Sequence, residues 1–334
     1  MIEFIPFPKI GQFRNTIKHV RMTDSPLPVL EYEGTIKLHG TNAAICQDED
    51  GNIWFQSRKR VITPDDDNHG FAEYMANNVG YKRLQSLFAE VKLKNSQDHN
   101  YPIAIFGEWC GGNIQNGVAL SELEKMFVIF GIRLGEEDYR TWYNFTEDGH
   151  DLFLTKHRIF NALQFQTKGI TIDFSSPALS QNKLGELTEE VERECPVAKF
   201  FDVSGVGEGI VWKCVTKGYE SSNYWFKVKG EKHSASKVKT LAPVDLELVK
   251  SIDEFINNTV TPQRLEQGIE ILHQEAKPIS EKSTGDFLRW VFNDVYEEEA
   301  DIIEASGFDK KMLGKPISQK AKEWFFSYLD DVAA

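Results

Sequence analysis

The tetrad Lys37-Leu38-His39-Gly40, followed by Thr41 and Asn42, joins a segment of extended character to a tight turn. A lysine at such a turn can hold its amine against a phosphate, and a glycine supplies the backbone freedom for a close approach to a ligand. A single lysine is ordinarily a solvated surface residue, so the interpretation depends on the segments that follow. These segments are Ser57-Arg58, Phe106-Gly107-Glu108, Phe130, Glu208-Gly209 with Val211 and Lys213, and Lys227-Val228-Lys229.

Around this tetrad, the first two thirds of the sequence combine strand and helix patterns. Seven segments join β-branched and aromatic residues to turn formers at their ends, which is typical of strands. Asp50-Gly51, between two of them, indicates a hairpin. The predicted strands are 34–38, 43–47, 53–57, 103–108, 126–132, 209–215 and 224–228, and the predicted helices are 71–76, 82–91 and 187–195. We therefore expect an α+β fold for this part.

Past Pro243 the strand patterns fade and apolar residues recur at helical spacing. Thr261-Pro262 and Thr284-Gly285-Asp286 have the character of helix starts, and Gly307 has that of a helix stop. The apolar stripes are Leu246, Val249, Ile252, Phe255 and Ile256; Leu265, Ile269 and Leu272; and Phe287, Val291, Phe292 and Val295. The sequence thus predicts two domains, a mixed one over 1–240 and an all-helical one over 244–334.

Size and composition are those of a soluble globular protein. The 334 residues suffice for two domains, and 41% hydrophobic with 27% charged residues is ordinary. The apolar run 126–132 is too short to span a bilayer, and residues 1–4 lack the pattern of a secretory signal. The four cysteines form no C-x-x-C pair, which favours reduced thiols over disulfides or a zinc site. We expect a cytoplasmic protein without a membrane partner.

The charge is unevenly distributed along the chain. The formal net charge is −13, and residues 245–334 carry −9 of it, with 19 Asp and Glu against 10 Lys and Arg. Residues 227–239 hold five lysines and one glutamate, a local net charge of +4. Overall acidity argues against a protein coated in basic patches, but this lysine-rich segment can accept a polyanion.

Taken as a set, the ordered segments that begin at Lys37 resemble the motifs of the covalent nucleotidyltransferases, the polynucleotide ligases and capping enzymes. In particular they resemble the double-strand RNA ligases of the phage RNA ligase 2 type, whose C-terminal domain the helical region after Pro243 also resembles. The resemblance implies a nucleotidyltransferase domain over 1–240, with antiparallel sheets around the nucleotide. It implies ATP and Mg²⁺ (or Mn²⁺) as cofactors and, as partner, nicked duplex RNA with 5′-phosphate and 3′-hydroxyl ends. We expect the enzyme to be a monomer.

The resemblance assigns the covalent chemistry to Lys37, whose amine would attack the α-phosphorus of ATP and hold AMP as a phosphoramidate. Neighbouring cations, partial burial or a bound metal would help a lysine amine to lose its proton. Lys227 and Lys229 would lie beside the AMP phosphate and stabilise the charge that develops there. From the residues alone, these two lysines also fit an alternating strand that protects a sheet edge.

Two glutamates are implied metal ligands. Glu208 stands in a glycine-rich run that lacks the spacing and the following helix of a dinucleotide-binding motif. The run matches Glu-Gly-x-Val-x-Lys instead, in which the glutamate helps to bind a divalent metal, Lys213 contacts phosphate and Val211 lies beside the nucleotide. Glu108 would hydrogen-bond the ribose 2′-hydroxyl and assist the metal-dependent steps; a structural salt bridge is its alternative role. Hard oxygen ligands suit Mg²⁺ or Mn²⁺.

The resemblance also implies polar contacts to the nucleotide. Arg58 would contact the ribose or its phosphate, although Lys59 and Arg60 offer alternatives in the same run. His39 can bind a phosphate or the backbone of its own loop, because a neutral imidazole does either. Asn42 flanks the same turn.

The adenine contacts rest on two positions. Phe130 would stack on the base, with Phe127 as the alternative in the same apolar run. Ile36 directly precedes Lys37, where the phage-type enzymes often carry an acidic residue that contacts the adenine amino group. Backbone groups can recognise adenine instead, and the choice of ATP over GTP follows from the overall resemblance rather than from this contact.

The function implied by the resemblance is ATP-dependent ligation of RNA in three steps, as in RNA repair. Lys37 is adenylylated, the AMP moves to an RNA 5′-phosphate, and a 3′-hydroxyl then displaces AMP. A DNA ligase and a capping guanylyltransferase are alternatives, but both usually carry an OB-fold where this sequence is helical. A catalytically silent nucleic-acid-binding module is a further alternative, disfavoured because every lysine and glutamate position of the motifs is filled.

Overall fold

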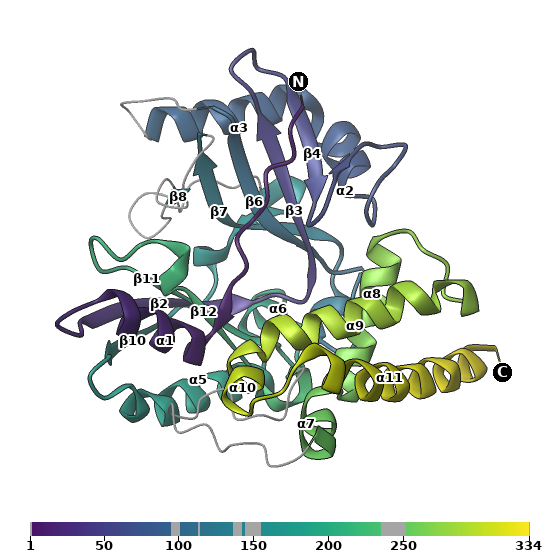
Figure 1. Cartoon of the computed structure of the whole chain (residues 1–334). Coiled ribbons are helices and arrows are strands. Elements are labelled where there is room, and N and C mark those ends of the chain that lie inside the picture. Colours follow the sequence, from purple (N-terminus) through teal and green to yellow (C-terminus); the bar gives the residue numbers. More distant parts are fainter. Residues whose placement is uncertain are drawn as a thin grey trace. The chain divides into compact units, whose positions relative to one another are not determined.

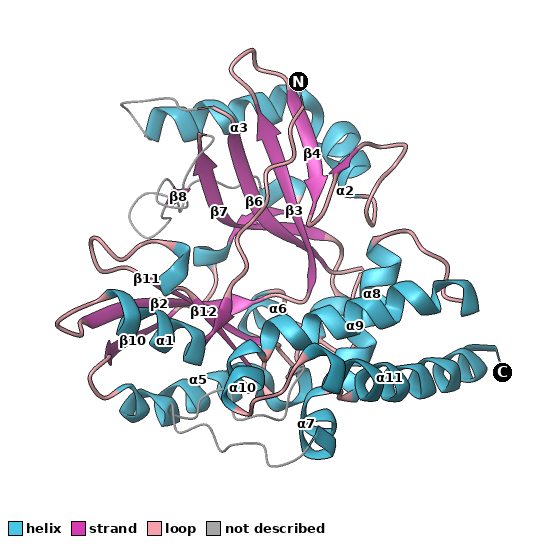
Figure 2. Cartoon of the chain, viewed as in Figure 1, coloured by secondary structure: helices cyan, strands magenta, loops and turns pink. Residues whose placement is uncertain are grey.

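The computed structural model describes residues 2–94, 101–112, 114–135, 142–143, 155–234 and 252–333 (Figure 1, Figure 2). The chain divides into two compact units, Met1–Gly230 and Glu231–Ala334. The first unit contains two sheets with flanking helices, and the described part of the second is helical. The predicted α+β class is therefore confirmed. The predicted domain boundary, between residues 240 and 244, lies outside the described residues.

The first sheet has five strands in the order β1-β12-β11-β2-β10. Neighbouring strands are antiparallel except β1 and β12, which are parallel. The strands are β1 (Gly11–Gln12), β2 (Val29–Lys37), β10 (Lys168–Asp173), β11 (Gly209–Cys214) and β12 (Phe226–Lys229). The predicted strand 34–38 is thus the end of a longer strand that begins at Val29.

Alternation along these strands gives the first sheet an apolar face and a polar face. Tyr32 and Ile36 of β2 are buried on the apolar face. The ring of Phe13 packs there against that of Phe226, with the ring centres 4.8 Å apart. Helices α1 (Phe13–Thr23) and α5 (Gln181–Arg193) pack on this sheet. Helix α6 (Pro196–Phe200) follows α5 in the chain.

The second sheet has the order β5-β4-β3-β6-β7-β8, and β9 pairs in parallel with β7. The strands are β3 (Gly40–Gln47), β4 (Ile53–Ser57), β5 (Val61–Ile62), β6 (Ile103–Cys110), β7 (Met126–Leu134), β8 (Trp142–Tyr143) and β9 (Ile159–Asn161). The hairpin predicted at Asp50-Gly51 joins β3 to β4. Gly51 takes a φ of 85°, which favours glycine.

Helices cover one face of the second sheet. They are α2 (Phe71–Glu73), a π-helical segment (Tyr74–Gly80) and α3 (Tyr81–Lys94). The ring of Phe71 lies 5.6 Å from Trp109 and 5.0 Å from Phe127, both on strands of the sheet. Short 3₁₀ turns span Ala119–Glu122, Thr155–His157, Ala162–Gln164, Pro177–Ser180, Ser222–Tyr224, Glu231–His233 and Glu281–Ser283.

The second unit has its own core, to which the predicted apolar stripes contribute, except Leu246 and Val249, which lie outside the described residues. Its helices are α7 (Ile252–Thr259), α8 (Pro262–Gln274), α9 (Thr284–Glu298), α10 (Ala300–Ala305) and α11 (Lys310–Ala333). The predicted helix start at Thr261-Pro262 is confirmed, because the Thr261 side chain accepts a hydrogen bond from Arg264 N–H. None of the helices described has the length and apolar character needed to traverse a bilayer.

Candidate active site

The turn after Lys37 carries the chain from the first sheet to the second, because β2 ends at Lys37 and β3 begins at Gly40 (Figure 1). Only glycine fits at the start of β3, since a Cβ on Gly40 would lie 2.3 Å from the carbonyl oxygen of Trp109. The tetrad that opens the motif series is therefore the junction between the two sheets.

Strand register aligns the predicted lysines on the polar face of the first sheet. Gly209 of β11 pairs with Lys37 on one side and with Lys229 on the other. One row further along, Val211 pairs with Lys227. Because side chains two residues apart share a face, the structure brings these four predicted positions together around Gly209.

Glu208 is the centre of a cluster of charged side chains. The Nζ of Lys37 donates to its Oε2 at 2.7 Å, and the Nζ of Lys229 lies 2.9 Å from its Oε1. His39 Nδ1 lies 3.3 Å from Oε2. We call these four residues the Glu208 cluster. Burial alone would raise the pKa of Glu208, but Lys229 and Lys37 outweigh burial and hold the pKa well below its usual range.

The Glu208 cluster is open to a ligand on its cationic side. The side chain of Glu208 is 1% exposed, whereas those of Lys37 and Lys229 are 22% and 18% exposed. Two amines therefore share one ionised carboxylate and remain partly accessible. Such a surplus of positive charge in a partly buried site attracts phosphate.

Glu108 lies in β6 directly opposite Asn42 in β3. Its Oε1 accepts a hydrogen bond from the N–H of Gly40 at 3.1 Å. Burial raises the pKa of Glu108 to about 7, with Lys37 lowering it and Glu208 raising it. The charges of the Glu208 cluster thus act on Glu108, which places both predicted metal ligands at one site.

The two carboxylates offer the oxygen donors that Mg²⁺ and Mn²⁺ prefer. Within the described ranges, no group of three or more His, Cys, Asp and Glu side chains gathers to hold a metal. Both oxygens of Glu208 contact cationic side chains. The donors therefore fit an ion that is bound largely through the phosphate oxygens of a ligand, with one or two carboxylates completing its coordination.

Lys213 occupies the next row of the polar face, opposite Glu33 of β2. Its Nζ donates to the carbonyl oxygen of Phe130 at 2.5 Å and lies 4.7 Å from the ring centre of Trp225. Burial lowers the pKa of Lys213 to about 8, and Glu33 opposes this shift. In this structure Lys213 therefore connects the first sheet to β7 of the second.

Phe130 lies at a bulge of β7. The register between β6 and β7 shifts at Phe106 and Gly107, which leaves Phe130 as the extra residue. A bulge redirects the side chain of its extra residue. Phe130 is partly exposed, whereas Phe127 is fully buried in the core beneath α2. Of the two predicted rings, only Phe130 is accessible to a ligand.

Arg58 contacts a residue that carries no sequence motif. Its Nη1 donates to the carbonyl oxygen of Phe7 at 2.8 Å, and the ring of Phe7 lies 5.0 Å from that of Phe130. Nearby Arg60 instead pairs with Asp66 at 2.6 Å. A lone phenylalanine between prolines gives no periodic signal, so only the folded structure relates Phe7 to this site.

Ile36 does not present its side chain to the site. It is 5% exposed and pairs with Ile210, on the face opposite to that of Lys37. A nucleotide contact from this position is limited to backbone atoms, as the sequence suggested. His39 contacts Glu208, a partner that the sequence does not indicate.

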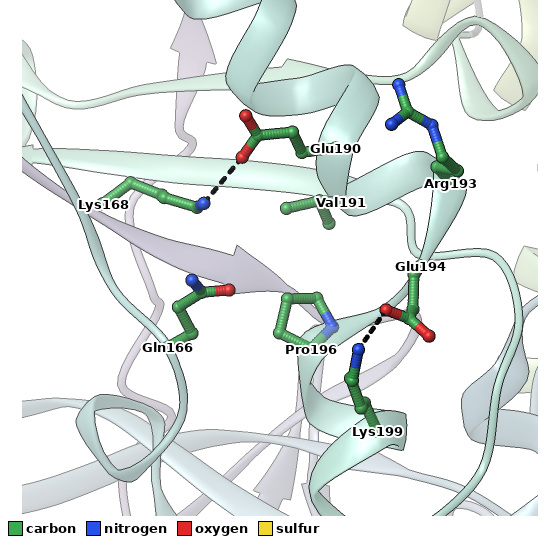
Figure 3. Close-up of a pocket in the computed structure, with 8 residues that line it drawn as sticks. All are labelled: Gln166, Lys168, Glu190, Val191, Arg193, Glu194, Pro196 and Lys199. Atoms are coloured by element: carbon green, nitrogen blue, oxygen red, sulfur yellow. Dashed lines mark hydrogen bonds and ion pairs between the residues drawn. The ribbon is translucent and has the colours of Figure 1, made fainter.

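A separate cavity of about 250 Å³ lies along α5 and α6. In Figure 3, Lys168 points toward Glu190 and Lys199 toward Glu194, at 2.8 Å and 2.5 Å. None of its lining residues belongs to the Glu208 cluster. Both of its lysines pair with glutamates of the same lining, which also carries Arg193.

The family model for RNA ligase matches residues 30–229, more than half of the chain, and this span includes the whole Glu208 cluster. The chain belongs to the RNA ligase family. No curated protein matches the sequence.

Solved structures similar to this RNA ligase family member include those of the Naegleria gruberi RNA ligase. A mutant with ATP and Mn has 15% sequence identity and a TM-score of 0.44, covering 70% of this chain and 58% of that chain. The ligase with PPi and a mutant with AMP and Mn each have 16% identity, a TM-score of 0.44 and the same coverage. This chain thus spans less than two thirds of the length of those structures.

Proposed function

We propose that this member of the RNA ligase family is an ATP-dependent RNA ligase that acts through a covalent lysyl-AMP intermediate on Lys37. The observation that supports the proposal is the Glu208 cluster, in which Lys37 and Lys229 hold one buried carboxylate from two strands. The pairing places the amine of Lys37, which is 22% exposed, beside a second lysine amine that can stabilise charge on a phosphate.

The first step transfers AMP to the protein. The Nζ lone pair of Lys37 forms a bond to the α-phosphorus of ATP, the bond to the pyrophosphate oxygen breaks, and the Nζ proton passes to solvent. Glu208 does not take this proton, because its pKa lies well below the usual range and so low a pKa makes a poor base. Glu208 instead holds the amine in place until the phosphates of ATP replace it.

The lysines of β12 stabilise the phosphate during this transfer. Lys229 lies across Gly209 from Lys37, and Lys227 lies one row away on the same face. Fixed cations at the position where negative charge develops lower the barrier of phosphoryl transfer. Lys213 would reach the phosphate only by leaving the Phe130 carbonyl, so its part is secondary.

Phe130 supplies the ring for adenine, while Asn42 and Glu108 face the sugar from neighbouring strands. Stacking of a base on an aromatic ring is worth about 1–3 kcal/mol. Glu208 and Glu108 would hold Mg²⁺ or Mn²⁺ with the nucleotide bound; the ion would neutralise phosphate charge.

The two later steps seal the strand. An oxygen of the RNA 5′-phosphate attacks the phosphorus of lysyl-AMP and releases the amine of Lys37. The 3′-hydroxyl then attacks the 5′-phosphorus, and AMP leaves with the bonding electron pair. We propose nicked duplex RNA as the substrate of a monomeric cytoplasmic enzyme of the phage RNA ligase 2 type. Support comes from residues 252–333, which are helical where a DNA ligase or capping enzyme usually has an OB-fold.

The decisive experiment incubates the protein with α-³²P-ATP and magnesium and looks for acid-stable label on the polypeptide. We expect label on the wild type and on Lys168→Ala, a control lysine outside the site, and none on Lys37→Ala. Label on Lys37→Ala would overturn the nucleophile assignment. Equal labelling from GTP would favour a capping enzyme.

A second experiment identifies the nucleic acid. The adenylylated protein is given nicked duplexes of RNA, of DNA and of mixed strands, and sealed product is measured. We expect nicks in RNA to be sealed fastest. Preferential sealing of all-DNA nicks would support the DNA ligase alternative, and labelled protein that seals nothing would contradict the ligase proposal.

A further inference from the structure

The N-terminal segment Phe4–Ile10, here called the N-terminal strap, connects the two sheets of the first unit. Ile5 exchanges two hydrogen bonds with the buried amide of Gln56 in β4: its N–H donates to Oε1 at 3.0 Å, and Nε2 donates to its carbonyl. After the strap, β1 joins β12 in the first sheet. Figure 1 shows this path as the purple trace that runs from the second sheet to the first. The strap is therefore held at both ends.

Phe7 is fixed between these two anchors by its backbone and by its ring. The guanidinium of Arg58 donates to its carbonyl oxygen at 2.8 Å and lies 6.0 Å from its ring centre. The ring centre of Phe7 lies 5.2 Å from that of Phe106 and 5.0 Å from that of Phe130, with an edge-on angle of 68° to the latter. Edge-to-face contact is a favoured geometry for aromatic pairs.

Phe130 needs such support because of its place in β7. It is the extra residue of the bulge, so the strand ladder does not fix its direction. Lys213 holds its carbonyl oxygen, and the ring of Phe7 contacts its ring at 68°. The direction of the Phe130 ring thus depends on two residues that are remote from it in sequence.

We propose that Phe7 is a positioning residue of the nucleotide site, which fixes the Phe130 ring in the orientation that stacks on the base of ATP. This inference rests on the proposed function, because it takes Phe130 as the base platform. Arg58 then acts on the nucleotide through Phe7, by locking the strap at its carbonyl. If Phe7 only packed in the core, substitutions at Phe7 and Phe130 would have independent effects on ATP binding. A positioning role requires the two effects to be coupled.

The test measures the rate of lysyl-AMP formation against ATP concentration in a double-mutant cycle of Phe7→Leu and Phe130→Leu. The control is Phe174→Leu, which trims a fully buried ring that packs against Phe13 on the apolar face of the first sheet. We expect each single change at Phe7 or Phe130 to raise KM for ATP about tenfold, with little change in the rate at saturating ATP. In the double variant, KM for ATP should rise only about twentyfold over the wild type, because one ring acts through the other.

The outcomes separate the possibilities. Independent rings would multiply to about a hundredfold in the double variant, and this result would overturn the positioning role. A KM for Phe7→Leu no higher than that of Phe174→Leu would do the same. If Phe7→Leu does not fold, Phe7→Met takes its place in the cycle. Absence of label on the wild type contradicts the proposed function itself, whereas a labelled wild type with an unchanged KM in Phe7→Leu contradicts this inference alone.

Discussion

Replacing Glu208 by glutamine tests the charge balance of the site, because it removes the carboxylate that two amines share and keeps its shape. Removing one partner of a buried ion pair costs about 3–5 kcal/mol. The side chains of Lys37 and Lys229 are 22% and 18% exposed, so water solvates part of their unpaired charge and reduces this cost. We therefore expect the free energy of unfolding to fall by about 2–3 kcal/mol. For a unit of this size, the loss corresponds to a Tm lowered by about 5–10 °C.

The same substitution should strengthen ATP binding in the absence of metal. In the wild type, the phosphates must replace Glu208 as the partner of Lys37 and Lys229, whereas in Glu208→Gln both amines are available. We expect ATP in EDTA to bind about 5 to 30 times more tightly, a gain of about 1–2 kcal/mol, even as lysyl-AMP formation falls. Calorimetric titration and thermal unfolding with and without ATP measure both effects.

The matched control is Glu190→Gln, which breaks an ion pair of similar length with Lys168 at a side chain that is 50% exposed. This control should change stability by less than about 1 kcal/mol. The charge argument for the Glu208 cluster is wrong if Glu208→Gln has the Tm of the wild type. It is also wrong if Glu208→Gln binds ATP in EDTA no more tightly than the wild type does.

Three further predictions concern backbone, pH and the helical unit. Gly209→Ala should lower the free energy of unfolding by more than about 2 kcal/mol, because φ is 153° and a Cβ would lie 2.2 Å from a carbonyl oxygen. The control Gly169→Ala has open space around the new Cβ and should unfold like the wild type. Equal losses of stability in the two variants would refute this prediction. The pKa of Glu108 is raised from 4.5 to about 7, so its contribution to stability is complete below pH 4.5 and is lost as the pH rises through 7. The Tm of the wild type should therefore fall over this range, and Glu108→Gln should flatten the fall. Parallel plots of Tm against pH for the two proteins would contradict the raised pKa. Glu299→Gln removes one of the carboxylates that pair with Arg264, a side chain that is 1% exposed. The free energy of unfolding in urea should fall by about 3–5 kcal/mol. A fall of less than about 1 kcal/mol would show that Asp294 alone is a sufficient partner for Arg264.

Strands rich in β-branched and aromatic residues, and the order of the motifs, could be predicted from the sequence. The strand predicted over 53–57 matches β4, and those over 103–108 and 209–215 lie within two residues of β6 and β11 at each end. Strands β4 and β6 are almost continuously buried, and β-branched and aromatic residues between turn formers indicate such strands locally. The lysine and glutamate positions came from their order along the chain, and the structure places Lys37 and Glu208 in contact.

Elements and contacts without a local signal were missed. Helix α1 buries Phe13, Ile17 and Val20 at helical spacing, but none of the Ser, Thr, Asp or Asn side chains that usually cap a helix precedes it. Strand β10 has the sequence KGITID, in which Ile170 and Ile172 are the two apolar side chains, so its strand signal is short. The contact between Arg58 and Phe7 joins residues 51 positions apart, and periodicity carries no information on such pairs.

The register of β12 shows why apolar residues determine the chemistry of this site. Phe226 is fully buried and Val228 is 3% exposed, so both must point to the apolar face. Because side chains alternate, a slip of one residue would turn Lys227 and Lys229 into the core and expose two apolar side chains. That cost holds Lys229 opposite Gly209, and hence across Glu208 from Lys37. The position of the amines is therefore set by hydrophobic burial on the other side of the sheet, and changes that loosen this burial should misplace Lys229 before they unfold the protein.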